Sequence, residues 1–421
     1  MWLLRMPRSS FARLIVDCSN EVGRNSAHPV LSFPSMTVSF WQRSSKNLPE
    51  IDCDLCIIGA GITGASTARW LKRVAPRMRV AIVEARTIAA GASGRNAGMV
   101  LAGLADHYDR MIEVLGRAVA REAWQATLDH QRHLSEIFPD DGHSVRLERC
   151  GSWRVGFEAS EREHLELSAA LLRDDGFPAE YHAADPLDRG FHGALGIDSD
   201  AGVHPVLVVE ALIAAAGADV YRNCEVIELK SEDGHVSVQT SGATFRARRV
   251  IIAANAYAPR IDSFFGPLVT PHRGQILVTA PVGRRVLDRL VYAHHGYIYF
   301  RQLPDYRFLI GGWRHEFAER EMGFADETSA DVQQSLGKFL GRYFPELSGV
   351  TVESRWAGTM GFSPDGLPIV GVLPRDERIS YAVGFTGHGF GLALEVTRRL
   401  VNLILAGEPC GIFGAARLKT V

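Results

Sequence analysis

Three glycines in the first part of the chain constrain its fold more than any other feature. Gly59, Gly61 and Gly64 form the pattern G-x-G-x-x-G. The apolar residues 55–58 before them predict a buried strand, and residues 63–74 after them predict a helix. In this context Gly59 permits a tight turn, Gly61 lets the backbone approach a diphosphate, and Gly64 lets the helix pack on the strand. The segment therefore predicts a dinucleotide-binding fold of the Rossmann type.

A second predicted strand, residues 79–83, completes the β–α–β unit and ends at Glu84. An acidic side chain at this place accepts hydrogen bonds from ribose hydroxyls and disfavours the 2′-phosphate of NADP. The helix around Ile62 and Thr63 supplies backbone N–H donors and a partial positive charge for a diphosphate. A glycine-rich turn that binds no ligand is the structural alternative.

A second run of small residues follows Glu84, where a classical NAD enzyme would begin its next helix. Small side chains in a loop permit the close approach of a flat or phosphate-bearing ligand, although a plain surface loop has the same composition. The residues of this stretch that we expect to contact the ligand are Ala85, Arg86, Gly91, Ser93, Gly94, Arg95, Asn96, Ala97, Gly98 and Met99.

A third glycine-rich segment, residues 384–391, lies between a predicted strand at 381–383 and a predicted helix at 392–406. The order of strand, glycine loop and helix N-terminus is thus repeated. A helix N-terminus aimed at a flavin would stabilise the negative charge of the reduced ring. A second phosphate-like turn or plain packing is the alternative.

Together these segments resemble the D-amino-acid oxidase-like family of FAD-dependent oxidoreductases, of the glycine oxidase, sarcosine oxidase and gamma-glutamylputrescine oxidase type. The resemblance covers about residues 38–410 and rests on the first glycine turn, the loop 91–98 and the block 356–391. It implies FAD as cofactor. It also implies an α/β (α+β) fold in which a Rossmann-like FAD-binding domain is interleaved with a mixed-sheet substrate domain.

The resemblance also gives expected boundaries. The FAD-binding domain is expected to comprise residues 51–105, 196–265 and 350–410. The substrate domain is expected to comprise residues 106–195 and 266–349. The remaining segments are an N-terminal arm that we expect to be poorly ordered, residues 1–50, and a C-terminal tail, residues 411–421. The Arg-rich start of the arm also fits a transit peptide or a start codon placed too early, with Met36 as the true start.

Further cofactor contacts are implied by the same resemblance. In the family the residue that matches Val226 contacts the adenine through its backbone, and the segment around Ala254 and Asn255 passes close to the diphosphate. The C-terminal block supplies the other expected cofactor residues, namely Gly358, Met360, Asp365, Gly387, His388, Gly389, Phe390 and Gly391.

Three positions depart from the family pattern. Gly358 stands where sarcosine oxidase carries its flavin-linking Cys, and Arg95 stands where other relatives carry a linking His. We therefore expect the FAD to be non-covalent. Met360 stands where glycine oxidase carries the Arg that binds the substrate carboxylate, a task that needs a guanidinium. Arg301 and Arg314, on other strands, are candidates to replace it.

The resemblance implies an enzyme that removes hydride from a C–N bond of a small amine or amino acid (CH-NH or CH-NH2 donors). Oxygen, a quinone or another electron carrier would be the acceptor. Strand alternation places Tyr297, Tyr299 and Arg301 on one face. We expect His388, Tyr299 and Arg301 to be the catalytic residues, with core packing or loop capping as the structural alternatives.

Two other function classes remain open. A flavin domain of a tRNA-modifying enzyme would carry a basic face, and the net charge of -2 gives no field that favours nucleic acid. A non-catalytic flavoprotein subunit of a larger dehydrogenase would need an exposed apolar face or a cysteine cluster, and the cysteines are scattered.

Metal and membrane binding are not expected from the sequence. The C-x-x-C of Cys53 and Cys56 is interpreted as packing, because residues three apart on a strand face opposite sides and no second Cys/His pair follows. No stretch reaches the roughly 18 apolar residues of a membrane span. We therefore predict no metal centre and a cytoplasmic protein.

Overall fold

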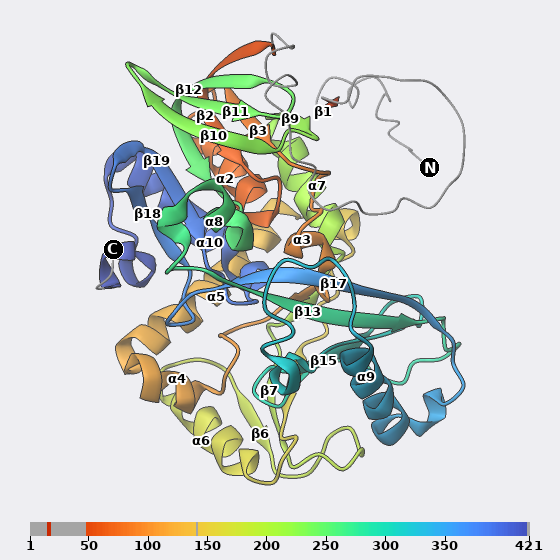
Figure 1. The fold of residues 1–421 in the computed structure, drawn as a ribbon. Coiled ribbons are helices and arrows are strands. Elements are labelled where there is room, and N and C mark those ends of the chain that lie inside the picture. The colour runs from red at the N-terminus through yellow and green to blue at the C-terminus, as the bar shows by residue number, and fades with distance from the viewer. Residues whose placement is uncertain (1–14, 18–47, 140–141, 419–421) are drawn as a thin grey trace, which may run out of the picture.

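The computed structural model describes residues 15–17, 48–139 and 142–418. Within them the chain forms one sheet in the upper half of Figure 1 and a second that begins with the long strands β13 and β17 across its middle. A short two-stranded ribbon pairs β4 (Met99–Val100) with β8 (Ala201–Gly202). The α/β class predicted from the sequence is confirmed.

The first sheet has nine strands and a parallel centre. Its order is β1-β9-β3-β2-β12-β11-β10, and β19 pairs with both β12 and β18. Parallel pairing from β1 through β12 to β19 brings the carboxyl ends of the central strands to one edge. The strands are β1 (Ile15–Asp17), β2 (Glu50–Ile58), β3 (Val80–Val83), β9 (Asp219–Arg222), β10 (Val226–Glu232), β11 (His235–Thr240), β12 (Thr244–Ile252), β18 (Ile369–Leu373) and β19 (Asp376–Val383).

Strand β2 shows how the two faces of this sheet are buried. Leu55 and Ile57 join a core that includes helices α2, α5, α7 and α10, while Cys56 and Ile58 join a second core with residues of β11, β12 and β19. An apolar run that is buried on both faces is the pattern of a central parallel strand. The helices of the first core are α2 (Ile62–Val74), α5 (Arg117–Ile137), α7 (Pro205–Ala216) and α10 (Gly389–Ala406).

The second sheet has eight strands in the order β17-β13-β16-β15-β14-β5-β7-β6 and is mostly antiparallel. Its strands are β5 (Ser152–Val155), β6 (Glu180–His182), β7 (Ala194–Ile197), β13 (Thr270–Thr279), β14 (Leu290–Ala293), β15 (Ile298–Gln302), β16 (Phe308–Gly312) and β17 (Val352–Phe362). The remaining helices are α3 (Ala92–Arg95), α4 (Tyr108–Leu115), α6 (Glu161–Asp174), α8 (Ala258–Ile261) and α9 (Ala330–Tyr343).

The two halves of the molecule interlock at β17 and α5. β17 pairs along β13, so the second sheet continues past residue 350, where we expected the FAD-binding segment to resume. α5 lies within the expected substrate segment and packs into the first core. Part of the predicted N-terminal arm, β1, adds an edge strand to the first sheet, and the rest of residues 1–47 lies outside the described residues. The division into two domains stays a prediction.

The C-x-x-C motif is buried as expected, but for a different reason. Both Cys53 and Cys56 lie in the same core, not on opposite faces. The N–H groups of Asp54 and Leu55 both donate to the carbonyl of Arg79, at 3.0 and 3.2 Å, which is the hydrogen-bond pattern of a β-bulge. The extra residue turns the Cys53 side chain to the face of Cys56. The Cys53 thiol, together with burial in this core, raises the pKa of Cys56 far above its ordinary value.

Candidate active site

A cavity of about 530 Å³ lies between the two sheets. Ile58 and Val83, at the carboxyl ends of β2 and β3, form part of its wall, and Gly274 and Tyr299 of the second sheet form another part. Ligands of open α/β sheets bind outside the carboxyl ends of the strands. The cavity therefore occupies the place that the β–α–β motif predicts for a dinucleotide.

The first glycine turn is built for close backbone packing. Gly59 has a φ of 111°, and a Cβ atom there would lie 2.9 Å from the carbonyl oxygen of Ala253. A Cβ atom on Gly64 would lie 2.0 Å from the carbonyl oxygen of Gly59. Gly64 thus does not line the cavity, and it lets α2 approach β2. Gly61 lines the cavity, where its backbone is open to a ligand.

Glu84 closes the same end of the cavity. One carboxylate oxygen accepts the N–H of Ala60 at 2.9 Å, and the other accepts the N–H of Arg86 at 2.9 Å. A carboxylate oxygen can accept more than one hydrogen bond, so the side chain is held in place with acceptor capacity left for ribose hydroxyls. Val226 lines this end as well.

The loop that follows ties the first sheet to the second. Ser93 Oγ accepts the N–H of Ile62 at 2.9 Å, so the loop reaches the N-terminus of α2. Arg95 donates to the carbonyls of Ala90 at 2.9 Å and Ala357 at 2.8 Å, and its own carbonyl accepts the indole N–H of Trp356 at 2.9 Å. The loop is thereby fixed against β17, and it forms a continuous part of the cavity wall.

The C-terminal glycine loop is held by Asn255. Its Oδ1 accepts the N–H groups of Gly384 at 2.9 Å and Phe385 at 3.3 Å. Gly387 has a φ of 81°, and α10 begins two residues later with His388 as its N-cap. The N-terminus of an 18-residue helix therefore faces the cavity, and its unpaired N–H groups carry partial positive charge there.

His388 and Tyr292 form a hydrogen-bonded pair on the cavity wall. His388 Nδ1 lies 3.1 Å from the carbonyl of Thr386, and Nε2 lies 3.2 Å from the hydroxyl of Tyr292. A carbonyl only accepts, so Nδ1 carries the proton and Nε2 accepts from Tyr292. Burial, aided by Arg154 and Arg314, lowers the pKa of His388 to about 4. The imidazole is therefore neutral at pH 7.

Tyr299 and Arg314 complete this end of the cavity. Tyr299 pairs with Tyr292 across β15 and β14, and burial raises the pKa of Tyr299 to about 12. Arg314 lies over the rings of Tyr297 and Phe362 at 4.8 and 4.9 Å. Its guanidinium forms no hydrogen bond or ion pair with the described residues. A cation without an acidic partner on a cavity wall is a binding group for an anion.

Most of the predicted site residues line this one cavity. They are Gly59, Gly61, Ile62, Thr63, Glu84, Ala85, Arg86, Gly91, Ser93, Arg95, Asn96, Ala97, Met99, Val226, Ala254, Asn255, Tyr299, Gly358, Met360, Gly387, His388, Gly389, Phe390 and Gly391.

Arg301, predicted to be catalytic, does not line the cavity, and its side chain has partners elsewhere. The side chain is 2% exposed. It donates to the carbonyl of Gly98 at 2.6 Å and forms an ion pair with Glu148. Strand alternation places it on the face of Tyr299, but two residues along a strand move a side chain about 7 Å, so Arg301 does not share the position of Tyr299 on the wall. Arg301 supports the loop behind the wall.

Three other predicted residues have packing roles. Asp365 caps its own turn by accepting the N–H of Leu367 at 3.2 Å and forms an ion pair with Arg417 at 2.7 Å. It does not contact the cavity. Cβ atoms on Gly94 and Gly98 would each lie 2.3 Å from a backbone carbonyl oxygen, so these glycines permit close packing of the loop.

Tyr292 and Gly274 are cavity residues that the sequence patterns did not identify. Tyr292 faces the cavity because β14 pairs with β15, and no sequence motif marks it. Gly274 lies beside Met360, whose Cε would be 2.9 Å from a Cβ at this position. The strand pairing of β13 with β17 was the signal needed, and a single sequence does not contain it.

The chain matches the family model described as FAD dependent oxidoreductase (DAO) over residues 54–403. The chain belongs to this family. The probable oxidoreductase OrdL of Rhizobium meliloti (strain 1021) is 28% identical over 81% of this chain and 80% of its own length. The glycine oxidase of Bacillus licheniformis is 27% identical over 85% of this chain and 94% of its own. The gamma-glutamylputrescine oxidoreductase of Escherichia coli (strain K12) is 26% identical over 85% of this chain and 85% of its own length.

The crystal structure of glycine oxidase from Geobacillus kaustophilus superposes with a TM-score of 0.74 and 24% identity, and covers 87% of this chain and 99% of that one. This likeness supports the fold. Family membership makes FAD the cofactor, and the glycine turns and Glu84 fit its dinucleotide. In the described part of the chain, no helix is long and apolar enough to span a bilayer.

Proposed function

We propose that this FAD-dependent oxidoreductase oxidises a CH–N bond of a small amino acid, or of an amine that carries a carboxylate. The observation that supports the proposal is Arg314, an unpaired guanidinium beside Tyr292, Tyr299 and His388 at one end of the FAD cavity. Met360 occupies the position from which glycine oxidases bind the carboxylate. In this chain Arg314, in the segment that follows β16, would supply the positive charge that binds the carboxylate.

The other end of the cavity would hold FAD through backbone groups. Gly59, Gly61 and the N-terminus of α2, which line the cavity, would hold the diphosphate, and Glu84 would accept from a ribose. Bound FAD supplies the acceptor for a hydride from the substrate carbon. The N-terminus of α10 places positive charge at the cavity wall, which favours an anionic reduced ring.

Arg314, Tyr299 and Met360 would orient the substrate. Arg314 binds the carboxylate by paired N–H donors, which fixes the direction of the C–N bond. Burial keeps the Tyr299 phenol protonated, so it donates a hydrogen bond without adding charge. Met360, whose methyl group packs on the backbone of Gly274, would give the substrate carbon an apolar contact.

Tyr292 and His388 would offer the substrate amine a neutral hydrogen-bond acceptor. The neutral His388 accepts the Tyr292 O–H through Nε2. The Tyr292 oxygen can then accept an N–H of the amine, and the pair adds no anion beside it, which would otherwise hold the amine in its charged form. His388, whose pKa is about 4, does not take up the substrate proton, so the amine would lose that proton to water before oxidation.

Non-covalent FAD binding is part of the proposal. A Cβ atom on Gly358 would lie 2.9 Å from the Cβ of Arg95, so the two positions that carry covalent links in relatives lie side by side here, and neither holds a nucleophile. Acid precipitation should release all flavin into the supernatant. Yellow colour retained in the pellet would contradict this part of the proposal.

The test of the reaction is anaerobic flavin bleaching. The FAD-loaded protein is mixed with glycine, sarcosine, D- and L-amino acids, and matched amines that lack a carboxylate. We expect bleaching by at least one amino acid and weaker bleaching by its decarboxylated analogue. No bleaching by any compound would favour a non-catalytic subunit or a tRNA-modifying enzyme. Reoxidation by air would distinguish oxygen from a quinone or another carrier as acceptor.

A further inference from the structure

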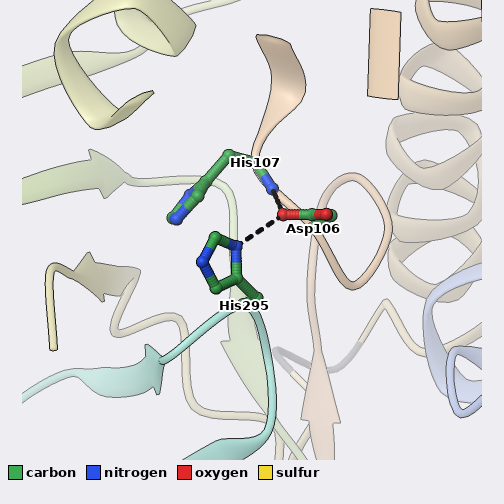
Figure 2. Close-up of side chains that lie close together, drawn as sticks. All are labelled: Asp106, His107 and His295. Carbon is green, nitrogen blue, oxygen red and sulfur yellow. Dashed lines mark hydrogen bonds and ion pairs between the residues drawn. The ribbon is translucent and has the colours of Figure 1, made fainter. Parts of the chain in front are cut away.

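Several histidines and carboxylates meet beside the cavity in a cluster that the proposed reaction does not use. One ligand atom each of Asp106, His107 and His295 lie within 4.8 Å of one another. Figure 2 shows the two imidazoles on one side of the Asp106 carboxylate, with the His295 ring and the backbone nitrogen of His107 next to it. One of its oxygens, Oδ1, lies 2.8 Å from His295 Nδ1 and 2.8 Å from the backbone N of His107.

We propose that Asp106, His107 and His295 bind one divalent first-row transition ion, of which Zn²⁺ is the probe of choice. Two imidazoles and one carboxylate form a ligand set that suits Zn²⁺ and its neighbours and disfavours Mg²⁺ and Ca²⁺, which prefer oxygen ligands alone. Three protein ligands leave at least one coordination position for water or an incoming group. No motif spacing in the sequence marks this ligand set, because His295 comes from a turn far along the chain.

The position of His107 is supported by a second carboxylate. Its Nε2 lies 3.3 Å from Glu161 Oε2, and both side chains are buried. A ligating histidine commonly donates its other ring N–H to a carboxylate, which fixes the tautomer and increases the basicity of the ligating nitrogen. With Nε2–H directed at Glu161, Nδ1 is the nitrogen available for the ion. Glu161 is itself held by the N–H groups of Phe157 and Glu158, at 3.0 and 2.9 Å.

The turn that carries His295 is unusual. His294 and His295, between β14 and β15, have φ values of 50° and 52°. Two successive left-handed residues in a hairpin turn are usually Asn and Gly, and strained residues of this kind gather at functional sites. Here the strained backbone presents His295 to Asp106, and the ring of His295 lies 4.9 Å from that of His107.

The proposed ion site adjoins the cavity. Ala105, which precedes Asp106, and Gly296, which follows His295, both line the cavity wall. Asp106 and His295 are partly exposed, with side-chain exposures of 43% and 33%, while His107 is 5% exposed. The site is therefore anchored on its buried side and reachable from the other, as a metal entry path requires.

The test measures Zn²⁺ binding by the FAD-loaded full chain. Metal is removed with a chelator, and Zn²⁺ is then titrated in competition with a fluorescent chelator, with the bound metal counted by mass spectrometry after desalting. We expect about one equivalent per chain. D106N and H295N should each weaken binding at least about 100-fold, and E161Q about 10- to 100-fold. Asn tolerates the left-handed backbone at position 295, so H295N tests the imidazole and not the turn.

The matched control is H235N. His235 also contacts a carboxylate, Glu232, at 3.1 Å, but it has no third ligand in reach among the described residues. Its removal should leave Zn²⁺ binding unchanged. FAD content and circular dichroism confirm that each variant is folded. Absence of a Zn²⁺ equivalent in the wild type, or equal binding by D106N and H295N, would overturn the proposal and leave the cluster as a set of carboxylate–imidazole pairs.

Discussion

The two ends of the cavity are built from different parts of the protein. At the dinucleotide end, Gly59, Gly61 and Gly64 lie within one turn, and backbone atoms of Gly59 and Gly61 line the wall together with Glu84. At the substrate end, Tyr292 and Arg314 come from separate elements of the second sheet and its following segment. The contacts there come from side chains. Binding of a common cofactor depends on local backbone geometry, whereas recognition of a particular substrate depends on long-range assembly.

The largest loss of stability is expected from a change at the dinucleotide end of the cavity. Gly64→Ala places a Cβ 2.0 Å from the carbonyl oxygen of Gly59, and backbone must move to relieve the overlap. We expect a loss of at least about 3 kcal/mol in the free energy of unfolding, measured by urea denaturation, together with loss of bound FAD.

The control for Gly64→Ala is Gly337→Ala. Both glycines lie inside helices, α2 and α9, but nothing lies within 4 Å of a Cβ built at Gly337. Helix propensity then predicts a gain of about 0.5–1 kcal/mol for the control. Equal stability of the two variants would refute the close-packing explanation of the first glycine turn.

The next largest effect is expected on the affinity for FAD, measured separately from folding. Glu84→Ala removes the acceptor for the N–H groups of Ala60 and Arg86 and the expected acceptor for a ribose. Hydrogen bonds to a charged group contribute roughly 1.5–3 kcal/mol, so we expect the Kd for FAD to rise about 100-fold, measured by fluorescence titration of apoprotein. Glu225→Ala, an exposed acid on the same wall, should change the Kd by less than about threefold. A similar Kd change in both variants would contradict the role of Glu84.

The difference between the two ends of the cavity also explains which parts of the fold and the site could be predicted from the sequence. The strand before Gly59, the helix after it and the loop 384–391 were predicted because their signals are local. Alternation predicted the face of Arg301 but not that its side chain lies off the cavity wall, because alternation gives the face of a residue and not its distance along the sheet. Tyr292 was missed because its place depends on β14 pairing with β15, and the bulge that turns Cys53 depends on a single pair of hydrogen bonds to Arg79.

A smaller effect is expected at the substrate end. Tyr292→Phe removes the O–H that His388 Nε2 accepts and the oxygen proposed to accept the substrate N–H, while the ring remains. We expect the rate of anaerobic flavin reduction to fall about 10-fold with FAD content unchanged. Tyr306→Phe, which changes an exposed tyrosine, should leave the rate of flavin reduction at the wild-type value. If Tyr292→Phe also reduced the flavin at that rate, the role proposed for the Tyr292 hydroxyl would be wrong.

The smallest effect concerns pH. The folded pKa of His388 is about 4, below the ordinary value of 6.5. The unfolded chain therefore binds a proton between these pH values that the folded chain does not, so stability falls as pH drops through this window. His388→Gln should reduce the acid-induced loss between pH 7 and about 5.5 by about 1 kcal/mol, measured by thermal unfolding at each pH. An unchanged loss would show that His388 is not buried as a neutral ring.

The most direct test of the contrast between the two ends is Arg314→Met, assayed for FAD content and anaerobic reduction in the same sample. We expect full FAD content and a rise of about 100-fold in the amino-acid concentration that gives half-maximal reduction. Arg260→Met should change neither quantity, since Arg260 also lines the cavity but packs on Phe324. Normal reduction by Arg314→Met, or loss of its FAD, would contradict a substrate end that binds a carboxylate independently of the cofactor.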